Sequence, residues 1–186
     1  MDQDLVVGAQ SGDERAFERL TAANHPRLFR VAYGILRDRH LAEDATQEAF
    51  ISIWRTIRRL RDPSRFEAWS YRVLVRTCYA EAKRHPAAVF VHSVTPSEHI
   101  ARDAYATVID RDQLDRGFRR LSLEHRTVIV LRCLLDLPMD QVAEALGVAP
   151  GTVGSRLNRA LASLRSAMEA DARPPASTVV QPKVLT

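Results

Sequence analysis

The sequence predicts an all-α protein with two small helical domains joined by a flexible linker. Apolar residues recur at helical spacing over residues 12–85 and again over about 111–170, while strand-like alternation and Asn-Gly hairpin turns are missing from the first block. Between the two blocks, from His85 to about Asp110, this periodicity fades. The 186 residues leave room for one large or two small domains and suffice to bury a core.

The first block divides into four expected helices, and the second block into four shorter ones. The helices of the first block cover residues 12–23, 26–37, 40–59 and 66–84. Those of the second block cover residues 111–120, 122–135, 139–146 and 150–169. A loop at residues 61–65 precedes the helix that begins at residue 66, and Ser64 is placed to cap that helix.

These patterns set the expected domain boundaries. The first domain covers residues 1–85, the linker 86–110 and the second domain 111–170. Within the linker, residues 89–96 are expected to be extended and residues 97–106 to form a weak helix. Residues 171–186 lack any packing pattern, so we expect a disordered tail.

A helix-turn-helix pattern lies within the second block and begins at Leu137. Its first helix carries apolar residues at helical spacing: Val142, Ala143 and Leu146. Gly147 then supplies the turn that such motifs use. Pro150 stands in the first turn of the next helix, where a missing N–H costs nothing.

The second helix of this pattern has two different sides. Its inward side carries Val153, Leu157, Ala160, Leu164 and Met168, whereas its polar side carries Thr152, Ser155, Arg156 and Arg159. No acidic residue occurs from Ala145 to Met168. A recognition helix in the DNA major groove needs this layout. The alternative is an amphipathic core helix with a solvated face, but the Gly turn, the Pro start and the missing acids together favour DNA.

A basic stripe lies along the expected helix 66–84. Arg65, Arg72, Arg76, Tyr79 and Lys83 fall within a narrow arc, with Trp69 at its edge. Residues 51–85 hold nine Lys and Arg side chains against three carboxylates, a local net charge of +6. Cations interleaved with aromatic rings suit melted nucleic acid, because phosphates are neutralised and bases stack on the rings. The alternative is a solvated basic face; for Trp69 alone we prefer a place in the core.

The expected helix 40–59 carries a different kind of polar arc. Asp44, Gln47, Glu48, Arg55 and Arg58 form the arc, with Ile51 in its middle and Trp54 beside it. Apolar anchors with a charged rim are typical of protein-binding hot spots. A lone exposed isoleucine is common, however. Helical geometry alone therefore favours neither a partner surface nor an ordinary solvated face.

Composition excludes several classes of protein. The formal net charge of +4 favours a polyanionic partner without proving one. The sequence has no apolar run long enough for a membrane span and no signal-peptide segment. Cys78 and Cys133 are single and far apart in apolar helical contexts, so both are expected to be buried free thiols; a disulfide and a redox sensor are the alternatives. With neither a membrane span nor a signal peptide, we expect a cytoplasmic protein. No Cys/His cluster has zinc spacing, so we expect no metal, and we expect no cofactor.

These residues together resemble a known family. The stretch Asp44–Trp54 is similar to the "D-x-x-Q-x-x-F-x-x-x-W" signature in region 2 of bacterial sigma factors, and Phe66–Val73 resembles the next helix of that region. Residues 121–165 resemble region 4, particularly Gly151-Thr-Val and Ser155-Arg-Leu-Asn-Arg159. The resemblance covers about residues 10–85 and 111–168 in the right order. This two-domain arrangement is characteristic of the extracytoplasmic-function sigma factors.

The resemblance implies a mechanism and a role for each set of residues. Asp44, Gln47, Glu48, Ile51, Trp54 and Arg55 would bind core RNA polymerase at the β′ clamp helices, with further contact to the β subunit. Arg61, Arg65, Arg72, Arg76, Tyr79 and Lys83 would bind the −10 element as it opens, and the Arg61–Arg65 loop would surround an extruded base. Thr152, Ser155, Arg156 and Arg159 would read the −35 element as duplex. An anti-sigma protein is the expected regulator, and catalysis belongs to the polymerase.

This chain departs from the family pattern at four positions. Arg76 and Ala80 stand where the family often has Asn and an acidic or amide residue. Gly154 removes a common basic residue of the recognition helix, and Ala149 leaves that helix weakly capped. For these reasons the sequence does not predict a particular promoter.

Two other kinds of function compete with this interpretation. A helix-turn-helix regulator that acts without polymerase accounts for residues 137–168 but leaves the Asp44–Trp54 signature and the basic stripe unexplained. A small helical enzyme could use His25, His40 or His125, but no paired carboxylate, nucleophile or metal spacing supports it.

Overall fold

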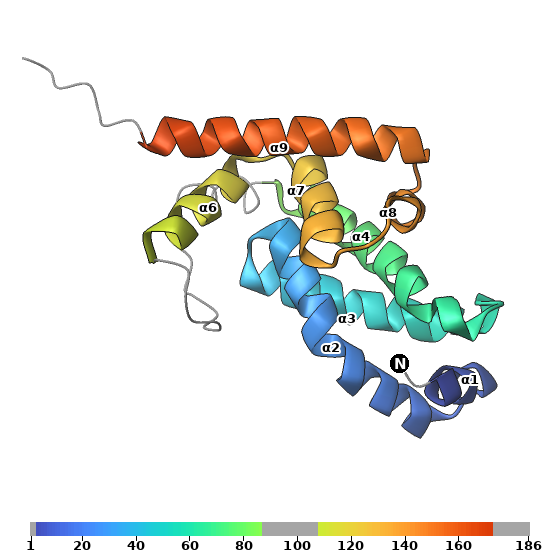
Figure 1. The fold of residues 1–186 in the computed structure, drawn as a ribbon. Helices are drawn as coiled ribbons and strands as arrows, with labels where there is room; N and C mark the ends of the chain where they lie inside the picture. Colours follow the sequence, from blue (N-terminus) through green and yellow to red (C-terminus); the bar gives the residue numbers. More distant parts are fainter. Residues whose placement is uncertain (1–2, 87–107, 173–186) are drawn as a thin grey trace, which may run out of the picture.

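A computed structural model describes residues 3–86 and 108–172, and every regular element in these two ranges is helical (Figure 1). The first domain contains α1 (Gln3–Ser11), α2 (Glu14–Leu36), α3 (Arg39–Thr56), the 3-10 turns η1 (Ile57–Arg59) and η2 (Pro63–Arg65), and α4 (Phe66–Arg84). The second domain contains α6 (Val108–Arg120), α7 (Leu123–Ile129), the π turn η3 (Val130–Leu134), α8 (Met139–Leu146) and α9 (Pro150–Ala172). The all-α prediction is confirmed, while the structure predicted for residues 89–106 and most of the tail lies outside the described residues.

Helix α1 precedes the first helix that the sequence predicts, at residues 12–23, and was not predicted. Val6 and Ala9 are its buried residues. A Cβ on Gly8 would lie 2.8 Å from the Cβ of Ala16, so the glycine allows α1 to approach α2 closely. The side chain of Gln10 donates hydrogen bonds to the carbonyls of Ile57 (3.1 Å) and Leu60 (2.6 Å), which ties α1 to η1.

The predicted break before Pro26 is wrong, because α2 runs through the proline as one helix. A proline inside a helix costs about 3 kcal/mol. The helix persists because its apolar face, with Leu20, Leu28 and Val31, is fully buried in the core of the first domain. Asp13 caps the helix start by accepting hydrogen bonds from two backbone N–H groups.

The capping role predicted for Ser64 is also wrong. Asp62 is the capping residue of this loop: its carboxylate accepts hydrogen bonds from the backbone N–H of Ser64 (3.0 Å) and from the Ser64 hydroxyl (2.6 Å). These bonds lower the pKa of Asp62. The loop therefore forms the 3-10 turn η2, and α4 follows with Arg65 at its N-cap and no side-chain cap bond.

The two cysteines differ, and the prediction that both are buried is wrong for one of them. Both are free thiols; Cys78 is buried in α4, and this burial raises the pKa of its thiol. Cys133 is exposed in η3. A π turn holds more residues per turn than an α-helix, so it rotates Cys133 and Leu134 away from the core that Val130 and Leu131 enter.

The helix-turn-helix forms as predicted, with the turn at Gly147. This glycine has φ 67°, in the left-handed region that favours glycine. On α9, Val153, Ala160 and Leu164 are buried, and Leu157 and Met168 pack against the core. The predicted inward side of the second helix is confirmed.

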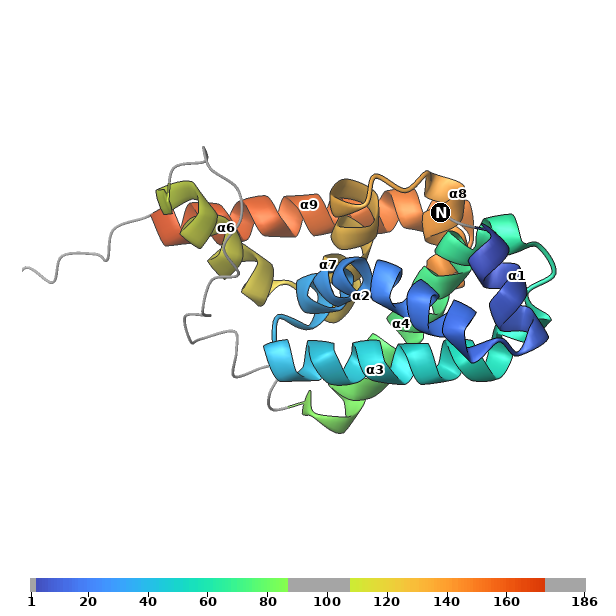
Figure 2. The ribbon, with the colours of Figure 1, turned by 90° about the horizontal axis from the view of Figure 1, so that it is seen from below.

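The two domains pack directly against each other. Helix α4 lies against α8, and α2 lies against α7 and η3 (Figures 1 and 2). The buried apolar side chains of both domains belong to one continuous cluster. The sequence predicted two domains but not this contact between them.

Candidate polymerase and nucleic-acid interfaces

The predicted apolar spot on α3 faces solvent. Ile51 is 44% exposed and Trp54 is 36% exposed. The opposite side of the helix, with Ala49 and Ile53, is buried. The polar residues of the predicted set surround the spot: Asp44, Gln47 and Arg55 are exposed, and Glu48 is half-buried. We call this set, with Ile51 and Trp54, the α3 surface.

Sequence reasoning missed one member of this surface, Phe17 of α2. Its ring centroid lies 4.7 Å from that of Trp54, with the two planes tilted by 47°. Such tilted pairs stabilise each other by about 0.5–1.5 kcal/mol beyond burial. Phe17 thus holds the indole in place, and the only sequence signal for it is a phenylalanine on the adjacent helix.

The basic stripe on α4 is partly covered. Arg76 and Lys83 are exposed, as are Arg61 and Arg65 of the preceding loop, but Arg72 and Tyr79 are half-buried. Burial raises the pKa of the Tyr79 hydroxyl, which lies close to Thr127 of the second domain. Trp69 is also half-buried and packs on Phe66, with ring centroids 6.0 Å apart. It therefore lies at the margin of the core, whereas the preferred prediction placed it within the core.

A small cavity of about 230 Å³ lies beside the η2 loop. Its lining residues come from α1, η2 and α4: Gln3, Val6, Pro63, Ser64 and Glu67. Glu67 forms an ion pair with Arg27 of α2, whose guanidinium also lies 5.3 Å from the centre of the Tyr71 ring. Helix α1 thus completes a wall of this cavity that the sequence did not predict.

The predicted recognition residues of α9 fall into two groups. Ser155 and Arg159 are exposed, and Thr152 is half-buried. The Arg156 side chain is only 20% exposed, and its guanidinium forms an ion pair with Glu124 of α7 at 3.4 Å. Two of the four predicted side chains are therefore open to solvent, whereas Arg156 is held by its own domain.

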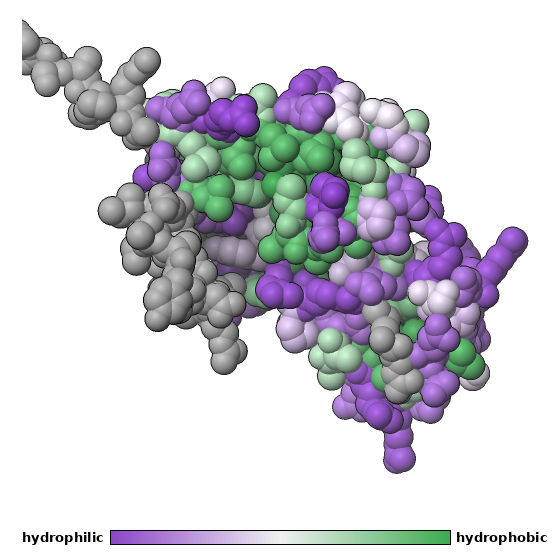
Figure 3. Space-filling view, viewed as in Figure 1, coloured by the Kyte–Doolittle hydropathy of each residue, from purple (hydrophilic) through white to green (hydrophobic). Residues whose placement is uncertain are grey.

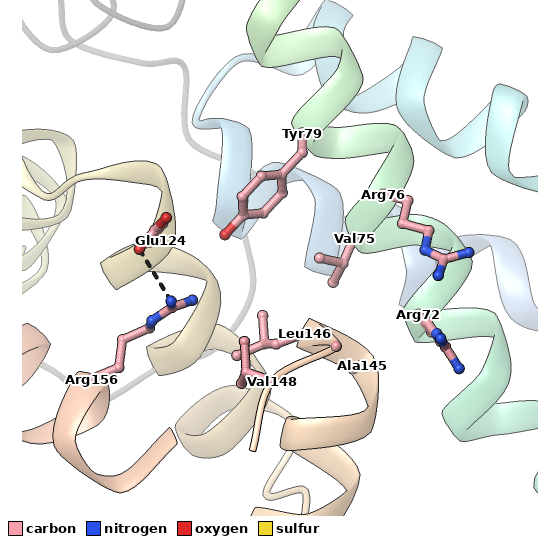
Figure 4. A pocket seen from close by; sticks show the side chains of 10 residues that line it. Arg72, Val75, Arg76, Tyr79, Glu124, Ala145, Leu146, Val148 and Arg156 are labelled. Carbon is pink, nitrogen blue, oxygen red and sulfur yellow. Dashed lines mark ion pairs between the residues drawn. The ribbon is translucent and has the colours of Figure 1, made fainter. Parts of the chain in front are cut away.

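A cavity of about 530 Å³ lies between the two domains (Figure 4). Its lining residues are Arg72, Val75, Arg76 and Tyr79 from α4, Glu124 from α7, Ala145 to Val148 from α8 and the turn, and Arg156 from α9. The close-up shows the α4 side chains on one side of this space and the Glu124–Arg156 pair on the other. We call it the interdomain cavity; it brings the basic stripe and the helix-turn-helix together.

Apolar surface also gathers on the second domain, along α7 and α9 (Figure 3). In the second domain, Leu134 of η3 and Leu161 of α9 are exposed. Within residues 3–86 and 108–172, no helix is long and apolar enough to cross a membrane. The same residues contain no group of three or more His, Cys, Asp or Glu side chains that could hold a metal ion.

This combination of an all-α fold, an exposed apolar spot, a basic stripe and a helix-turn-helix is that of a DNA-binding transcription protein. The family model for Sigma-70 region 2 matches residues 20–86, and that for Sigma-70, region 4 matches residues 111–164. The ECF RNA polymerase sigma factor SigM of Mycobacterium tuberculosis is 32% identical over 165 residues, which are 88% of this chain and 82% of SigM. SigW of Bacillus subtilis is 26% identical over 173 residues, covering 86% of this chain and 92% of SigW.

A solved structure supports the same fold. CnrH, in complex with the cytosolic domain of CnrY, aligns with a TM-score of 0.67 at 24% identity, covering 91% of this chain and 98% of CnrH. The chain belongs to the extracytoplasmic-function sigma factors of the sigma-70 family. It is thus a sigma factor for promoter-directed transcription, with core RNA polymerase and promoter DNA as its partners.

Proposed function

We propose that the first domain binds core polymerase and captures the −10 element, while the second domain reads the −35 element. One observation carries this division of labour: the two family matches coincide in order with the two helical domains. The basic stripe lies on the first domain, and the helix-turn-helix lies on the second. An independent helix-turn-helix regulator is not favoured, because it leaves the region 2 match unexplained.

The α3 surface is the proposed contact for the β′ clamp helices. Ile51 and Trp54 supply an apolar centre, and the charged residues around them supply a rim, which is the anatomy of a binding hot spot. Phe17 holds Trp54 in place, so little side-chain entropy is lost on binding. The exposed leucines of the second domain, Leu134 and Leu161, are the proposed contact for the β subunit, since exposed apolar patches mark interaction sites.

The basic stripe and the η2 loop are the proposed −10 site. Arg72, Arg76 and Lys83 neutralise backbone phosphates of the opened strand. The small cavity beside Pro63 and Ser64 receives an extruded base. Extrusion costs a few kcal/mol, so contacts within the pocket must compensate for the lost stacking.

Helix α9 is the proposed −35 reader. Ser155 and Arg159 project from its exposed side and reach base edges or phosphates in the major groove. Arg156 is paired with Glu124, so it must exchange this partner before it can contact DNA. Glu124 thereby limits the contribution of Arg156.

Three further assignments follow from the same proposal. Nucleotide addition is left to the polymerase, and the chain is assigned no catalytic role. It acts in the cytoplasm, where template and polymerase are found. An anti-sigma protein that covers the α3 surface is the proposed regulator.

Core binding by a double variant tests this proposal. Asp44→Ala with Trp54→Ala removes one rim charge and one apolar anchor from the α3 surface, so it should abolish co-elution with core polymerase while helicity by circular dichroism stays unchanged. The matched control is Val7→Ala with Glu18→Ala, which removes an exposed apolar residue and a carboxylate outside α3. Full core binding by the first variant would contradict the assigned interface.

A further inference from the structure

We infer that Glu67 of α4 decides which base the small cavity beside η2 accepts. Its carboxylate selects a base whose edge places an amino group next to an unprotonated ring nitrogen, as in cytosine and adenine. The inference rests on the proposed function of this cavity and adds the chemistry that it recognises. Three observations carry it: the cavity itself, the side chains that hold Glu67, and the distribution of charge around η2.

The cavity has the size and the lining for a single base. Its volume of about 230 Å³ lies below the roughly 300–1,000 Å³ of pockets for drug-sized ligands. Val6 and Pro63 supply apolar walls, while Gln3, Ser64 and Glu67 supply polar groups. Gln3 and Val6 come from α1, which lies beside the turns between α3 and α4 (Figures 1 and 2). Such a cavity suits one flat ring system with apolar faces and a polar edge.

A network between α2 and α4 holds one oxygen of the Glu67 carboxylate. The Arg27 guanidinium forms an ion pair with Oε1 and donates a second hydrogen bond, 2.9 Å long, to Asn24 Oδ1. The Tyr71 hydroxyl, one turn further along α4, donates to the same Oε1 at 3.3 Å. Burial raises the pKa of Tyr71 to about 12, so this hydroxyl keeps its proton at neutral pH. Both acceptor positions of Oε1 are therefore used within the protein.

The other oxygen of the carboxylate, Oε2, is left for a ligand. Among residues 3–86 and 108–172, the hydrogen bonds and the ion pair of the Glu67 carboxylate all go to Oε1. The side chain is 44% exposed and lines the cavity. A carboxylate oxygen only accepts, so Oε2 binds an N–H donor. A single free oxygen does not allow the two-oxygen pairing that the neighbouring N–H groups of guanine would need.

The remaining polar groups of the cavity complete the match to a base edge. Ser64 donates its hydroxyl proton to Asp62 at 2.6 Å, so its oxygen can only accept. Glu67 Oε2 and Ser64 Oγ thus suit the two hydrogens of an amino group. The Gln3 amide offers the donor that the adjacent ring nitrogen needs. Cytosine and adenine present this edge, whereas thymine presents the acceptor O4, which a carboxylate repels.

The charges around η2 favour a base over a phosphate in the cavity. Arg61 and Arg65, on the two sides of the turn, are exposed cations that suit backbone phosphates. The cavity itself is lined by the Glu67 carboxylate, and the Asp62 carboxylate is bonded to its lining residue Ser64. A phosphate in the cavity would be repelled by these two anions. The backbone is therefore placed at the arginines, and the base enters the cavity.

An isosteric substitution tests this inference in the full chain bound to core polymerase. Glu67→Gln keeps the shape of the side chain and can still accept from Arg27 through Oε1. It places an amide N–H group in the position of Oε2, so a carbonyl of the base is favoured there instead of an amino group. The matched control is Glu43→Gln, which removes a carboxylate that pairs with Arg39 on α3 and does not line the cavity.

The probes are fork-shaped promoter fragments with a single-stranded −10 element, taken from a start site mapped by run-off transcription. At each −10 position in turn, dC is compared with dU, and dA with deoxyinosine. Each pair exchanges an amino group for a carbonyl on the same ring, and the pair that responds distinguishes cytosine from adenine. Affinity is measured by fluorescence anisotropy. The ratio within a pair is independent of the fraction of active protein, so a partly unfolded variant still reports its preference.

At one −10 position we expect the wild type and Glu43→Gln to prefer the amino base by about tenfold, the effect of one hydrogen bond to a charged group. Glu67→Gln should abolish or reverse this preference. An unchanged preference in Glu67→Gln, or no preference by the wild type at any position, would overturn the inference and leave the proposed function intact. If the fork probes bind no more tightly to core polymerase with this protein than without it, the proposed −10 function fails instead.

Discussion

The α3 surface and the basic stripe of the first domain differ in what lies against them. Ile51 and Trp54 of α3 are exposed, although they are large apolar side chains. The stripe on α4, although charged, is partly covered by the second domain through Glu144, Leu146 and Val148. The proposed polymerase surface is therefore open to a partner, whereas the proposed −10 surface is partly covered. This difference predicts larger effects on binding for changes at the α3 surface than for changes at the basic stripe.

A substitution at Ile51, in the centre of the α3 surface, should cause the largest loss of polymerase affinity. Ile51→Glu places a charge in the proposed hot spot, and loss of a hot-spot residue costs at least about 2 kcal/mol, or roughly 30-fold in affinity. Core polymerase binding measured by fluorescence titration should fall by at least this factor. Val7→Glu, at a similarly exposed valine of α1, is the control and should bind normally. Equal losses of affinity in both variants would mean that polymerase binding does not depend specifically on α3.

Removing the buried arginine between the domains should have the next largest effect. Arg126→Ala deletes the donor to the Leu36 carbonyl, and hydrogen bonds to charged groups contribute about 1.5–3 kcal/mol. We expect the free energy of unfolding in urea to fall by this amount, together with longer interdomain distances. Arg132→Ala removes an arginine that pairs with exposed Asp136, and it should change stability by less than about 0.5 kcal/mol. If the Arg126 variant has the same free energy of unfolding and the same interdomain distance as the wild type, this contact does not hold the domains together.

Truncating Phe17 should cause a smaller loss of polymerase affinity at the α3 surface. Phe17→Ala removes the ring that packs on Trp54, a pair of the kind that contributes about 0.5–1.5 kcal/mol. Polymerase affinity should drop by about two- to tenfold, and Phe17→Leu should recover part of the loss because it restores apolar contact. If Trp54 fluorescence and core affinity both stay unchanged in Phe17→Ala, the indole is positioned by other neighbours.

The smallest change in binding is expected when the ion pair between Arg65 and Glu144 is removed. Glu144→Gln removes the partner of Arg65, and exposed ion pairs contribute about 0–1 kcal/mol, which is at most roughly fivefold in an equilibrium constant. Duplex binding by the free protein should therefore rise slightly at low salt and match the wild type at high salt. A salt-independent increase would assign Glu144 a role other than charge pairing.

The structural features that could be predicted from the sequence are those determined by neighbouring residues in the chain. The bounds of α4 and α8 agree with prediction, because helical periodicity and the Gly147 turn define them. The run of α2 through Pro26 could not be predicted, since burial of the whole apolar face outweighs the local cost of the proline.

The candidate site shows the same limit. The exposed positions of Ile51 and Trp54 follow from helical geometry within one helix. The pairing of Arg156 with Glu124 and the covering of the basic stripe depend on contacts between separate helices. The close packing of α2 on η3 requires the small Gly34 opposite Val130, which lies 96 positions further along the chain. A single glycine inside a helix carries no signal of such a distant neighbour.

Run-off transcription tests the central claim most directly. Purified core polymerase and fragmented genomic DNA from the source organism are incubated with and without this protein, and the transcript starts are mapped. The account predicts discrete new start sites that require the protein and share −35 and −10 elements. It is contradicted if no such start sites appear while the protein alone binds duplex DNA at defined sequences, because the second domain would then act without polymerase.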